Sequence, residues 1–209
     1  MVPSSTKPVT EPTIRIAAQG GEPHLDRILS GFEEALAAIG WADLTVADVV
    51  RRARVSKRTF YEHFASKEAC LLALYERESA RLLALVAEAI ADRPPGEGRV
   101  ELGTSVYLGG LRSKPWLVRI LLVEILHLGR PGLELRRRVM RAFADLLVGE
   151  MRATGSDPSP SLAMAVVGGI NELILEAAED DRVDHLGELG APIAELVRGA
   201  LRVPASRPG

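Results

Sequence analysis

Two short helices joined by a tight turn are predicted by residues 45–67, TVADVVRRARVSKRTFYEHFASK. Thr45 and Asp48 have the spacing of a capping box, in which each side chain caps the backbone of the other at a helix start. The apolar residues that follow recur at helical spacing and form one buried face: Val46, Val49, Val50 and Ala53. The first helix is therefore expected to begin directly after Thr45.

The second helix of the pair is expected to follow a short break at Arg54 and Val55. Ser56 is a good N-cap because its hydroxyl can accept a hydrogen bond from a backbone amide of the first turn. Phe60 and Phe64 lie four residues apart and are predicted to face the core. The polar side chains of this helix are then expected to face outward: Lys57, Arg58, Thr59, Tyr61 and His63.

Positive charge gathers in this stretch, although the chain of 209 residues carries a formal net charge of −2. Between positions 51 and 67 one acid, Glu62, stands against six basic residues, so the local charge is +6 − 1 = +5. These basic residues are Arg51, Arg52, Arg54, Lys57, Arg58 and Lys67. The simplest alternative is a solvated basic face, but the capping, turn and core patterns all agree with a helix-turn-helix. Because a cationic helix of this kind can enter the major groove, the pattern predicts DNA binding.

A known family shares this pattern. Residues 53–68, ARVSKRTFYEHFASKE, are similar to the signature of the TetR family of bacterial transcriptional regulators. Upstream segments agree with it, namely RIL at 27–29, GW at 40–41 and LTVADV at 44–49. The resemblance covers about residues 25–75 and implies an all-α protein. An N-terminal three-helix, homeodomain-like helix-turn-helix domain would precede a C-terminal helical bundle for ligand binding and dimerisation.

One departure from the family pattern lies in the turn, where the family usually has glycine and this chain has Arg54. If the turn requires a left-handed backbone conformation, arginine adopts it at a modest cost in strain. Arg54 would then add a positive charge close to the DNA backbone.

The composition of the chain agrees with a helical protein. Hydrophobic residues make up 47% and aromatic residues only 4%, and Ala, Leu and Val dominate, which favours packed helices over a β-rich fold. The single cysteine, Cys70, allows no intramolecular disulfide, so a cytoplasmic location is expected. Because the first twenty residues contain no continuous apolar segment, neither a signal peptide nor a membrane span is expected there.

Four regions are predicted along the chain: a disordered N-terminal arm at 1–22, a DNA-binding domain at 23–66, a ligand-binding and dimerisation domain at 67–203, and a tail at 204–209. Pro23 and Gly40 are suited to begin and end a first helix. This first helix and the two helices at 45–67 are expected to share one core. Its residues would be Ile28, Phe32, Leu36, Val46, Val49, Val50, Val55, Phe60 and Phe64, with Trp41 and Leu44 at the edge. Further helices are predicted at 66–91, 98–112, 115–128, 131–154, 161–179 and 186–202.

Contacts with DNA can be assigned by position on the second helix of the pair. Lys57, Arg58 and Thr59 are exposed early positions and are expected to read base edges, because they can meet guanine acceptors or a thymine methyl. The family resemblance assigns phosphates to Tyr61, His63 and Lys67. Thr45 is expected to offer its hydroxyl or amide to a phosphate at a helix start.

Dimerisation is expected because one helix-turn-helix contacts too few bases, so such proteins pair over two half-sites of a pseudo-palindromic operator. The resemblance places the interface on the last two predicted helices. Their apolar stripes supply the candidates: Leu162, Val166, Gly169, Ile170, Leu173, Ile193, Leu196 and Val197. The alternative is that these helices only close the core of one protomer.

A small-molecule pocket is expected in the C-terminal bundle, again from the resemblance. Aromatic, aliphatic and isolated polar side chains are the candidates for its wall: Tyr107, Trp116, Ile120, Glu124, His127, Met140, Phe143, Asn171 and Glu172. Such a mixture suits a largely apolar effector with one or two hydrogen-bonding points. For each residue taken alone, ordinary core packing is the competing interpretation.

The predicted function is a homodimeric transcriptional regulator, a repressor released from its operator by a small-molecule effector. A helical-bundle enzyme is the first alternative; no phosphate-binding glycine loop or nucleophile motif supports it, and no cofactor is expected. Glu124 and His127 have the spacing of a diiron helix, but no second copy exists, so no metal is expected. A non-specific DNA organiser or a protein-interaction module is the remaining alternative.

Overall fold

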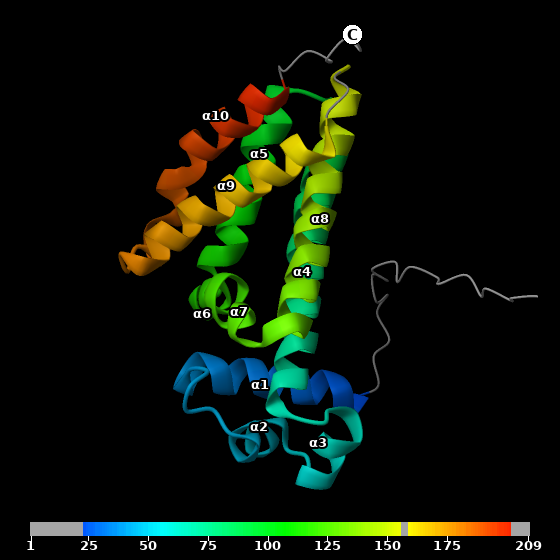
Figure 1. Ribbon diagram of the computed structural model, residues 1–209, viewed down its shortest axis with the longest axis vertical. Helices are drawn as coiled ribbons and strands as arrows, with labels where there is room; N and C mark the ends of the chain where they lie inside the picture. Colours follow the sequence, from blue (N-terminus) through cyan, green and yellow to red (C-terminus); the bar gives the residue numbers. More distant parts are fainter. Residues whose placement is uncertain (1–22, 156–158, 202–209) are drawn as a thin grey trace, which may run out of the picture.

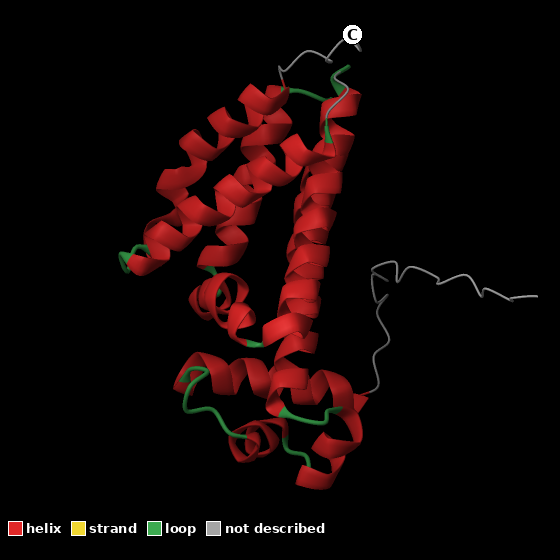
Figure 2. Ribbon diagram, in the orientation of Figure 1, coloured by secondary structure: helices red, strands yellow, loops and turns green. Residues whose placement is uncertain are grey.

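The structure is a computed structural model that describes residues 23–155 and 159–201, and these residues form helices and connecting turns without a strand (Figures 1 and 2). This confirms the predicted all-α fold class. The predicted N-terminal arm and C-terminal tail lie outside the described residues, as does the end of the last predicted helix.

Three helices make up the small domain at the bottom of Figure 1: α1 (Pro23–Ile39), α2 (Val46–Ala53) and α3 (Lys57–His63). Gly40 ends α1 with a φ of 81°, a left-handed conformation that glycine adopts without strain. The predicted core is buried at Ile28, Phe32 and Phe60, each 0% exposed. Leu44, predicted at the edge, is instead 1% exposed, because the α1–α2 connection turns it inward.

The contact between α1 and α2 is close at Gly31. A β-carbon built on Gly31 would stand 2.5 Å from the backbone nitrogen of Ala53 and 2.8 Å from its Cα. Such distances are far below van der Waals contact, so only glycine allows α2 to pack at this depth. This contact fixes how α1 holds the first helix of the helix-turn-helix.

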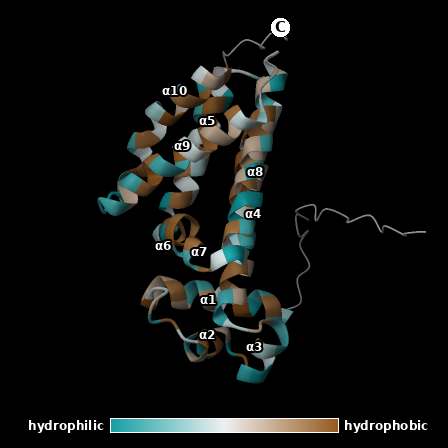
Figure 3. Ribbon diagram, viewed as in Figure 1, coloured by the Kyte–Doolittle hydropathy of each residue, from teal (hydrophilic) through white to brown (hydrophobic). Residues whose placement is uncertain are grey.

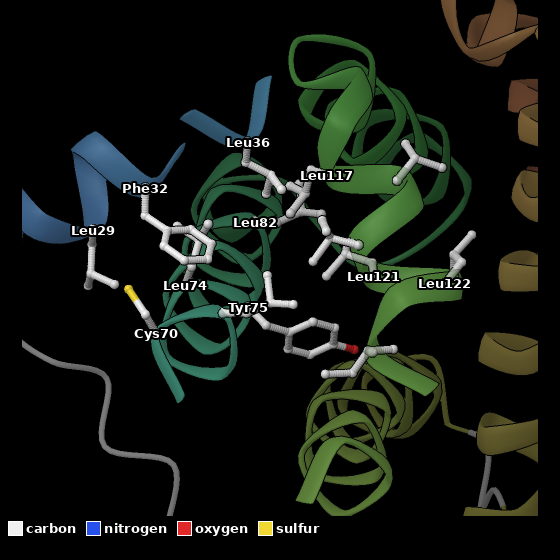
Figure 4. Close-up of a cluster of buried hydrophobic side chains, with 14 of the residues drawn as sticks. Leu29, Phe32, Leu36, Cys70, Leu74, Tyr75, Leu82, Leu117, Leu121 and Leu122 are labelled. Atoms are coloured by element: carbon white, nitrogen blue, oxygen red, sulfur yellow. The ribbon is translucent and has the colours of Figure 1, made fainter. Parts of the chain in front are cut away.

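The long helix α4 (Lys67–Ala91) belongs to both parts of the molecule. Its first turns pack against α1, and the rest runs through the upper body beside α5 and α8 (Figure 1). Figure 4 shows the resulting core passing from Leu29, Phe32 and Leu36 of α1 through α4 toward Leu117 and Leu121. The small domain and the body therefore share one hydrophobic core.

The upper body is a bundle that starts with α5 (Glu97–Arg112) and α6 (Pro115–Arg119). The chain continues through the π-helical turn η1 (Ile120–Glu124), α7 (Ile125–His127) and α8 (Gly129–Ala153). It ends with α9 (Pro160–Glu179), the 3-10 helix η2 (Val183–Leu189) and α10 (Gly190–Leu201).

Two predicted helices of the body differ from the observed ones. The segment predicted as one α-helix at 115–128 contains the π-turn η1 and ends at Gly129, whose φ is 62°. The helix predicted to begin at 186 begins as the 3-10 helix η2 and becomes α-helical only at Gly190. Apolar periodicity does not distinguish these helix types, because each buries one side of the chain over a few residues.

Helix α9 is the most apolar long helix of the body. By length and composition alone it is long and apolar enough to cross a membrane, with a mean hydropathy of 1.4, and 22% of that stretch is buried in the protomer. Figure 3 shows its hydrophobic residues in brown, whereas hydrophilic residues dominate around α3. Helix α9 packs against α8 and α10 within the protomer.

Candidate DNA-binding surface and ligand cavity

The start of α2 is held by the predicted capping box. The backbone amide of Thr45 donates to Oδ2 of Asp48 at 3.1 Å, and the amide of Asp48 donates to Oγ1 of Thr45 at 3.3 Å. The hydrogen bond from the Thr45 hydroxyl is the largest cause that keeps the pKa of Asp48 below its ordinary value. The prediction for this helix start is confirmed.

The turn between α2 and α3 also has the predicted form. Arg54 has φ 52° and ψ 45°, the left-handed conformation that glycine would adopt more easily, and its amide donates to the carbonyl of Val50. Ser56 then caps α3, because its Oγ accepts a hydrogen bond from the amide of Thr59 at 3.0 Å. The backbone hydrogen bond of Arg54 and the cap at Ser56 therefore offset the strain of the left-handed conformation at Arg54.

Helix α3 places Phe60 in the core, and its polar side faces solvent. Lys57 and Arg58 are exposed, and Tyr61 is 55% exposed with its ring edge against Phe60. Nε of Arg58 lies 3.0 Å from a carboxylate oxygen of Glu62, but the Arg58 side chain is 89% exposed. Such an exposed pair contributes little stability, so Arg58 is free to exchange Glu62 for another acceptor.

The six basic residues of this stretch have different partners. Arg51 pairs with Asp48 at 2.8 Å, and Arg52 donates to the carbonyl of Asp48 at 3.5 Å. Arg54 and Lys57 make no side-chain hydrogen bond or ion pair within the part of the chain that the structure describes, and both are exposed. The surface around α3 therefore presents at least two uncommitted positive charges.

Lys67 holds the connection between α1 and α2. Its ammonium donates to the carbonyl of Leu44 at 3.0 Å and to that of Trp41 at 3.4 Å, and it lies 4.4 Å from the centre of the Trp41 ring. An ammonium has three donors, so one remains for a phosphate. The sequence pattern did not indicate this internal role, because the partners are backbone carbonyls more than twenty residues away.

A cavity of about 160 Å³ lies in the body, between α4, α5, α8 and α9. Helix α4 lines it with one stripe of side chains at helical spacing: Tyr75, Ser79, Leu82, Val86 and Ile90. Its wall is mainly apolar, and the charged residues in it are Arg99 and Glu150, which pair with each other at 2.8 Å. The wall is therefore suited to a ligand that is mostly hydrocarbon.

A cluster of ion pairs lies where α1, α4 and the α5–α6 connection meet. Glu78 on α4 is 3% exposed and receives the Lys114 ammonium at 2.7 Å, Nε of Arg77 at 3.0 Å and a guanidinium nitrogen of Arg81 at 3.2 Å. The Lys114 ammonium also lies 2.7 Å from Glu33 of α1, which pairs with Arg77 at 3.2 Å. The cluster thus ties the DNA-binding domain to the body.

The charges in this cluster shift one another's pKa values. Burial raises the pKa of Glu78, but the hydrogen bond and charge of Lys114, with those of Arg77 and Arg81, lower it more. Burial lowers the pKa of Lys114, but its hydrogen bonds to Glu33 and Glu78 raise it more. Both groups are therefore held in their charged forms at neutral pH.

Known proteins share this arrangement. Residues 28–74, which contain α1, α2, α3 and the start of α4, match the sequence model of a family described as "Bacterial regulatory proteins, tetR family". Residues 28–74 therefore form a DNA-binding domain of the TetR family. The matched residues are those that form the capped helix-turn-helix above, so the predicted DNA-binding domain is confirmed as that of TetR-family transcriptional regulators.

Solved TetR-family structures extend the similarity to the whole fold. The fatty acid degradation regulator FadR from Bacillus halodurans is 18% identical, with a TM-score of 0.73 over 88% of this chain and 99% of that one. FadR from Bacillus subtilis in complex with stearoyl-CoA is 18% identical, with a TM-score of 0.71 over 82% and 96%. Regulatory protein TetR from Rhodobacter sphaeroides is 22% identical, with a TM-score of 0.66 over 84% and 99%. No curated protein sequence matches the chain.

The nine residues predicted for the pocket lie in different places in the body. Tyr107, Met140, Phe143 and Asn171 are in the cavity wall. The other five do not line the cavity: Trp116, Ile120, Glu124, His127 and Glu172.

Each of these five has a different environment. Ile120 is 2% exposed and packs in the shared core, and Trp116 packs against that core from the start of α6. Glu124 pairs with Arg119 at 2.9 Å, and His127 and Glu172 are exposed. In the same segment, Val118, Leu121 and Leu122 line the cavity instead.

Apart from Tyr107, the predicted wall lacks the side chains of α4 and α5. The α4 stripe is predicted only as a buried face, and Ser79, Arg99 and Thr104 are not among the predicted wall residues. A serine inside an apolar stripe was the available signal, because a buried hydroxyl requires a partner.

The predicted dimer residues are only partly accessible on α9 and α10. Val166 and Ile193 are 3% and 1% exposed, so they pack within the protomer, and Ile193 also lines the cavity with Ile170 and Val197. Leu196 is 38% exposed, and the remaining predicted residues, Leu162, Gly169 and Leu173, are half-buried.

Proposed function

We propose that the protein is a homodimeric transcriptional repressor that binds an operator through α3 and releases it when a small, largely apolar effector enters the cavity. The observation that supports this most strongly is the two-sided character of α3. Phe60 is fully buried, whereas Lys57 and Arg58 face open space at the start of a helix capped by Ser56.

On DNA, the first turn of α3 would meet base edges in the major groove. Lys57 and Arg58 would donate to guanine acceptors, and Arg58 would leave Glu62 to do so. Thr59 would offer its methyl group, because its hydroxyl lies 2.9 Å from that of Ser56. Phosphate contacts would come from Tyr61, His63 and the free donor of Lys67. Thr45 would contribute only by giving up a hydrogen bond to Asp48, because its hydroxyl and its amide both donate to that carboxylate.

Dimerisation would cover the open side of α9 and α10. Helix α9 is strongly apolar, yet little of it is buried in one protomer. Gly168 and Gly199 face open space, where a β-carbon would touch nothing, so a partner helix can approach closely. A second copy would bury Leu162, Leu173 and Leu196 and place two α3 helices about 34 Å apart for successive half-sites.

The response to an effector would pass along α4. Ser79 is in the cavity wall and its neighbour Glu78 belongs to the ion-pair cluster with Glu33 of α1. A ligand that displaces α4 would therefore move the DNA-binding domain. The effector and DNA would then weaken each other's binding by the same factor. That FadR from Bacillus subtilis was solved with stearoyl-CoA supports an effector with a long hydrocarbon chain here.

A regulator that is cytoplasmic, non-enzymatic and not anchored in a membrane fits these features. Cys70, the lone thiol, is fully buried beside Leu29 (Figure 4), and burial raises its pKa, so the sulfur stays protonated. A thiol in that state is a poor nucleophile. Its packing supports a structural role and gives no support to a covalent enzyme.

The experiment that tests this proposal is selection of DNA from a random duplex library by the full chain, followed by affinity measurements on the selected and scrambled duplexes. We expect a pseudo-palindromic site bound by two protomers at least about a thousandfold more tightly than scrambled DNA. Similar affinities for both duplexes would show a non-specific DNA organiser instead. Mass measurement of the free protein gives the oligomeric state independently.

A further inference from the structure

The cavity contains an unusual set of polar side chains. Within the described chain, five hydroxyl or amide side chains in its wall have no hydrogen-bond partner: Tyr75, Ser79, Thr104, Tyr107 and Asn171. Ser79 is the sharpest case, because it is 3% exposed and its Oγ is fully buried. Buried polar atoms in native proteins almost always have partners, so the Oγ of Ser79 indicates a ligand that supplies one, and the other four side chains are available to the same ligand.

The charge of the wall limits what that ligand can be. Glu150 and Arg99 neutralise each other, and Arg99 also donates to the carbonyl of Arg93 at 2.9 Å. Nε of Arg99 remains buried without a partner, which suits a neutral acceptor oxygen. A ligand carboxylate at this position would have to share the Arg99 guanidinium with Glu150. A charged ligand would therefore be buried without a counter-ion in the wall.

The two tyrosines of the cavity wall, Tyr75 and Tyr107, also offer no charge to a ligand. Burial raises the pKa of Tyr75 to about 12 and raises that of Tyr107 as well. Both phenols are therefore neutral at physiological pH, when each can donate and accept. Arg136, which does not line the cavity, partly offsets the rise in the pKa of Tyr75.

The shape of the cavity follows from the stripe on α4. Residues 75 to 90 span fifteen helical steps, or about 22 Å of helix axis. The volume of about 160 Å³ is small for that length and below the ordinary range for drug-sized ligands. The lining thus extends along much of α4, which suits an elongated hydrocarbon chain.

We propose that the cavity takes an uncharged, elongated molecule with an apolar chain and a neutral hydroxyl, carbonyl or amide group that hydrogen-bonds to Ser79 and its neighbours. This rests on the proposal that the cavity is the effector site. The class is narrower than an apolar effector, because it excludes free fatty acids and other anions with the same chain.

The test compares two nearly isosteric ligands, dodecanamide and dodecanoate, by displacement of the neutral fluorophore N-phenyl-1-naphthylamine from the full chain. Dodecanamide is expected to bind at least about tenfold more tightly than dodecanoate, because only the anion is buried without compensation. Ser79→Ala is expected to weaken dodecanamide at least about threefold. The matched control Ser105→Ala, at an exposed position on α5 outside the cavity wall, is expected to change neither affinity.

Equal or tighter binding of dodecanoate would overturn the inference, as would the absence of saturable displacement by either ligand. If dodecanoate binds equally or more tightly and also releases operator DNA, the neutral-ligand inference fails but the proposed effector response stands. Circular dichroism of Ser79→Ala establishes that the variant is folded, so a loss of affinity is assigned to the hydroxyl. Operator selection measures the DNA-binding proposal without any ligand.

Discussion

The helix-turn-helix at residues 45–67 and the cavity of the body differ in how far apart their residues lie in the sequence. The first is built from neighbours, such as Thr45 with Asp48 and Ser56 with Thr59. The second joins side chains of α4, α5, α8, α9 and α10, from Tyr75 to Val197. A change at a cap therefore acts on one short segment, whereas a change in the cavity wall acts on packing between distant helices.

The largest effect is expected at the close contact that supports the helix-turn-helix. Gly31→Val would force a side chain into the backbone of Ala53, so we expect a loss of about 3 kcal/mol in the stability of this domain. Chemical denaturation and operator binding measure the effect. Gly149→Ala is the control: nothing lies near its β-carbon, and helix propensity predicts stabilisation of up to about 1 kcal/mol. A tolerated Gly31→Val would refute the close packing of α1 on α2.

The next effect concerns the ion-pair cluster that joins the two regions. Lys114→Met leaves Glu33 and Glu78 with fewer partners, and we expect a loss of about 2 kcal/mol. Arg130→Met is the matched control, because Arg130 also lies 2.7 Å from a carboxylate, that of Glu134, but is 90% exposed. Its loss should leave the free energy of unfolding nearly unchanged, because an exposed ion pair contributes little. Equal effects would mean that the cluster is only a surface feature.

The same cluster gives a pH dependence with a definite sign. The pKa of Glu78 is lowered on folding from an ordinary value of 4.5, so its stabilisation is present above pH 4.5 and is lost as the pH falls toward the folded pKa. Lys114 has the opposite behaviour, and its stabilisation is lost above its ordinary pKa of 10.5. Urea denaturation of Glu78→Gln is expected to show a flatter acid limb, and an unchanged limb would contradict the assignment.

The smallest effect is expected at the cap of α3. Ser56→Ala removes the acceptor for the amide of Thr59 and should cost about 1 kcal/mol. Its consequence for operator binding should be of the same size, because the cap orders the turn that carries Lys57. Ser105→Ala is again the control, and it should leave the melting temperature unchanged. A Ser56→Ala protein as stable as the parent would show that the cap is dispensable.

These two regions also explain what the sequence could and could not predict. Thr45, Arg54 and Ser56 were identified from local spacing, because a cap or turn needs only residues within one or two helical turns. The internal role of Lys67 and the cluster around Glu78 were missed, because their partners are brought close only by the packing of α1 and α4. Tertiary contacts of this kind leave no periodic signal.

The pocket prediction shows the same limit. Tyr107 and Phe143, both predicted for the pocket, lie in the cavity wall, and their rings lie 5.5 Å apart. Glu124 and His127, also predicted, do not line it, because apolar spacing does not show which side of a helix faces a cavity. The dimer residues remain a prediction, with Val166 and Ile193 buried in the protomer.

The central claim is that the open side of α3 reads base edges. The most direct measurement is the affinity of the parent chain and of Arg58→Ala for the selected operator and for all its single-base variants, at one salt concentration. We predict that Arg58→Ala loses about 1–3 kcal/mol of discrimination at one or two base pairs of each half-site and none elsewhere. An equal loss on every duplex would assign Arg58 to phosphates and contradict the claim.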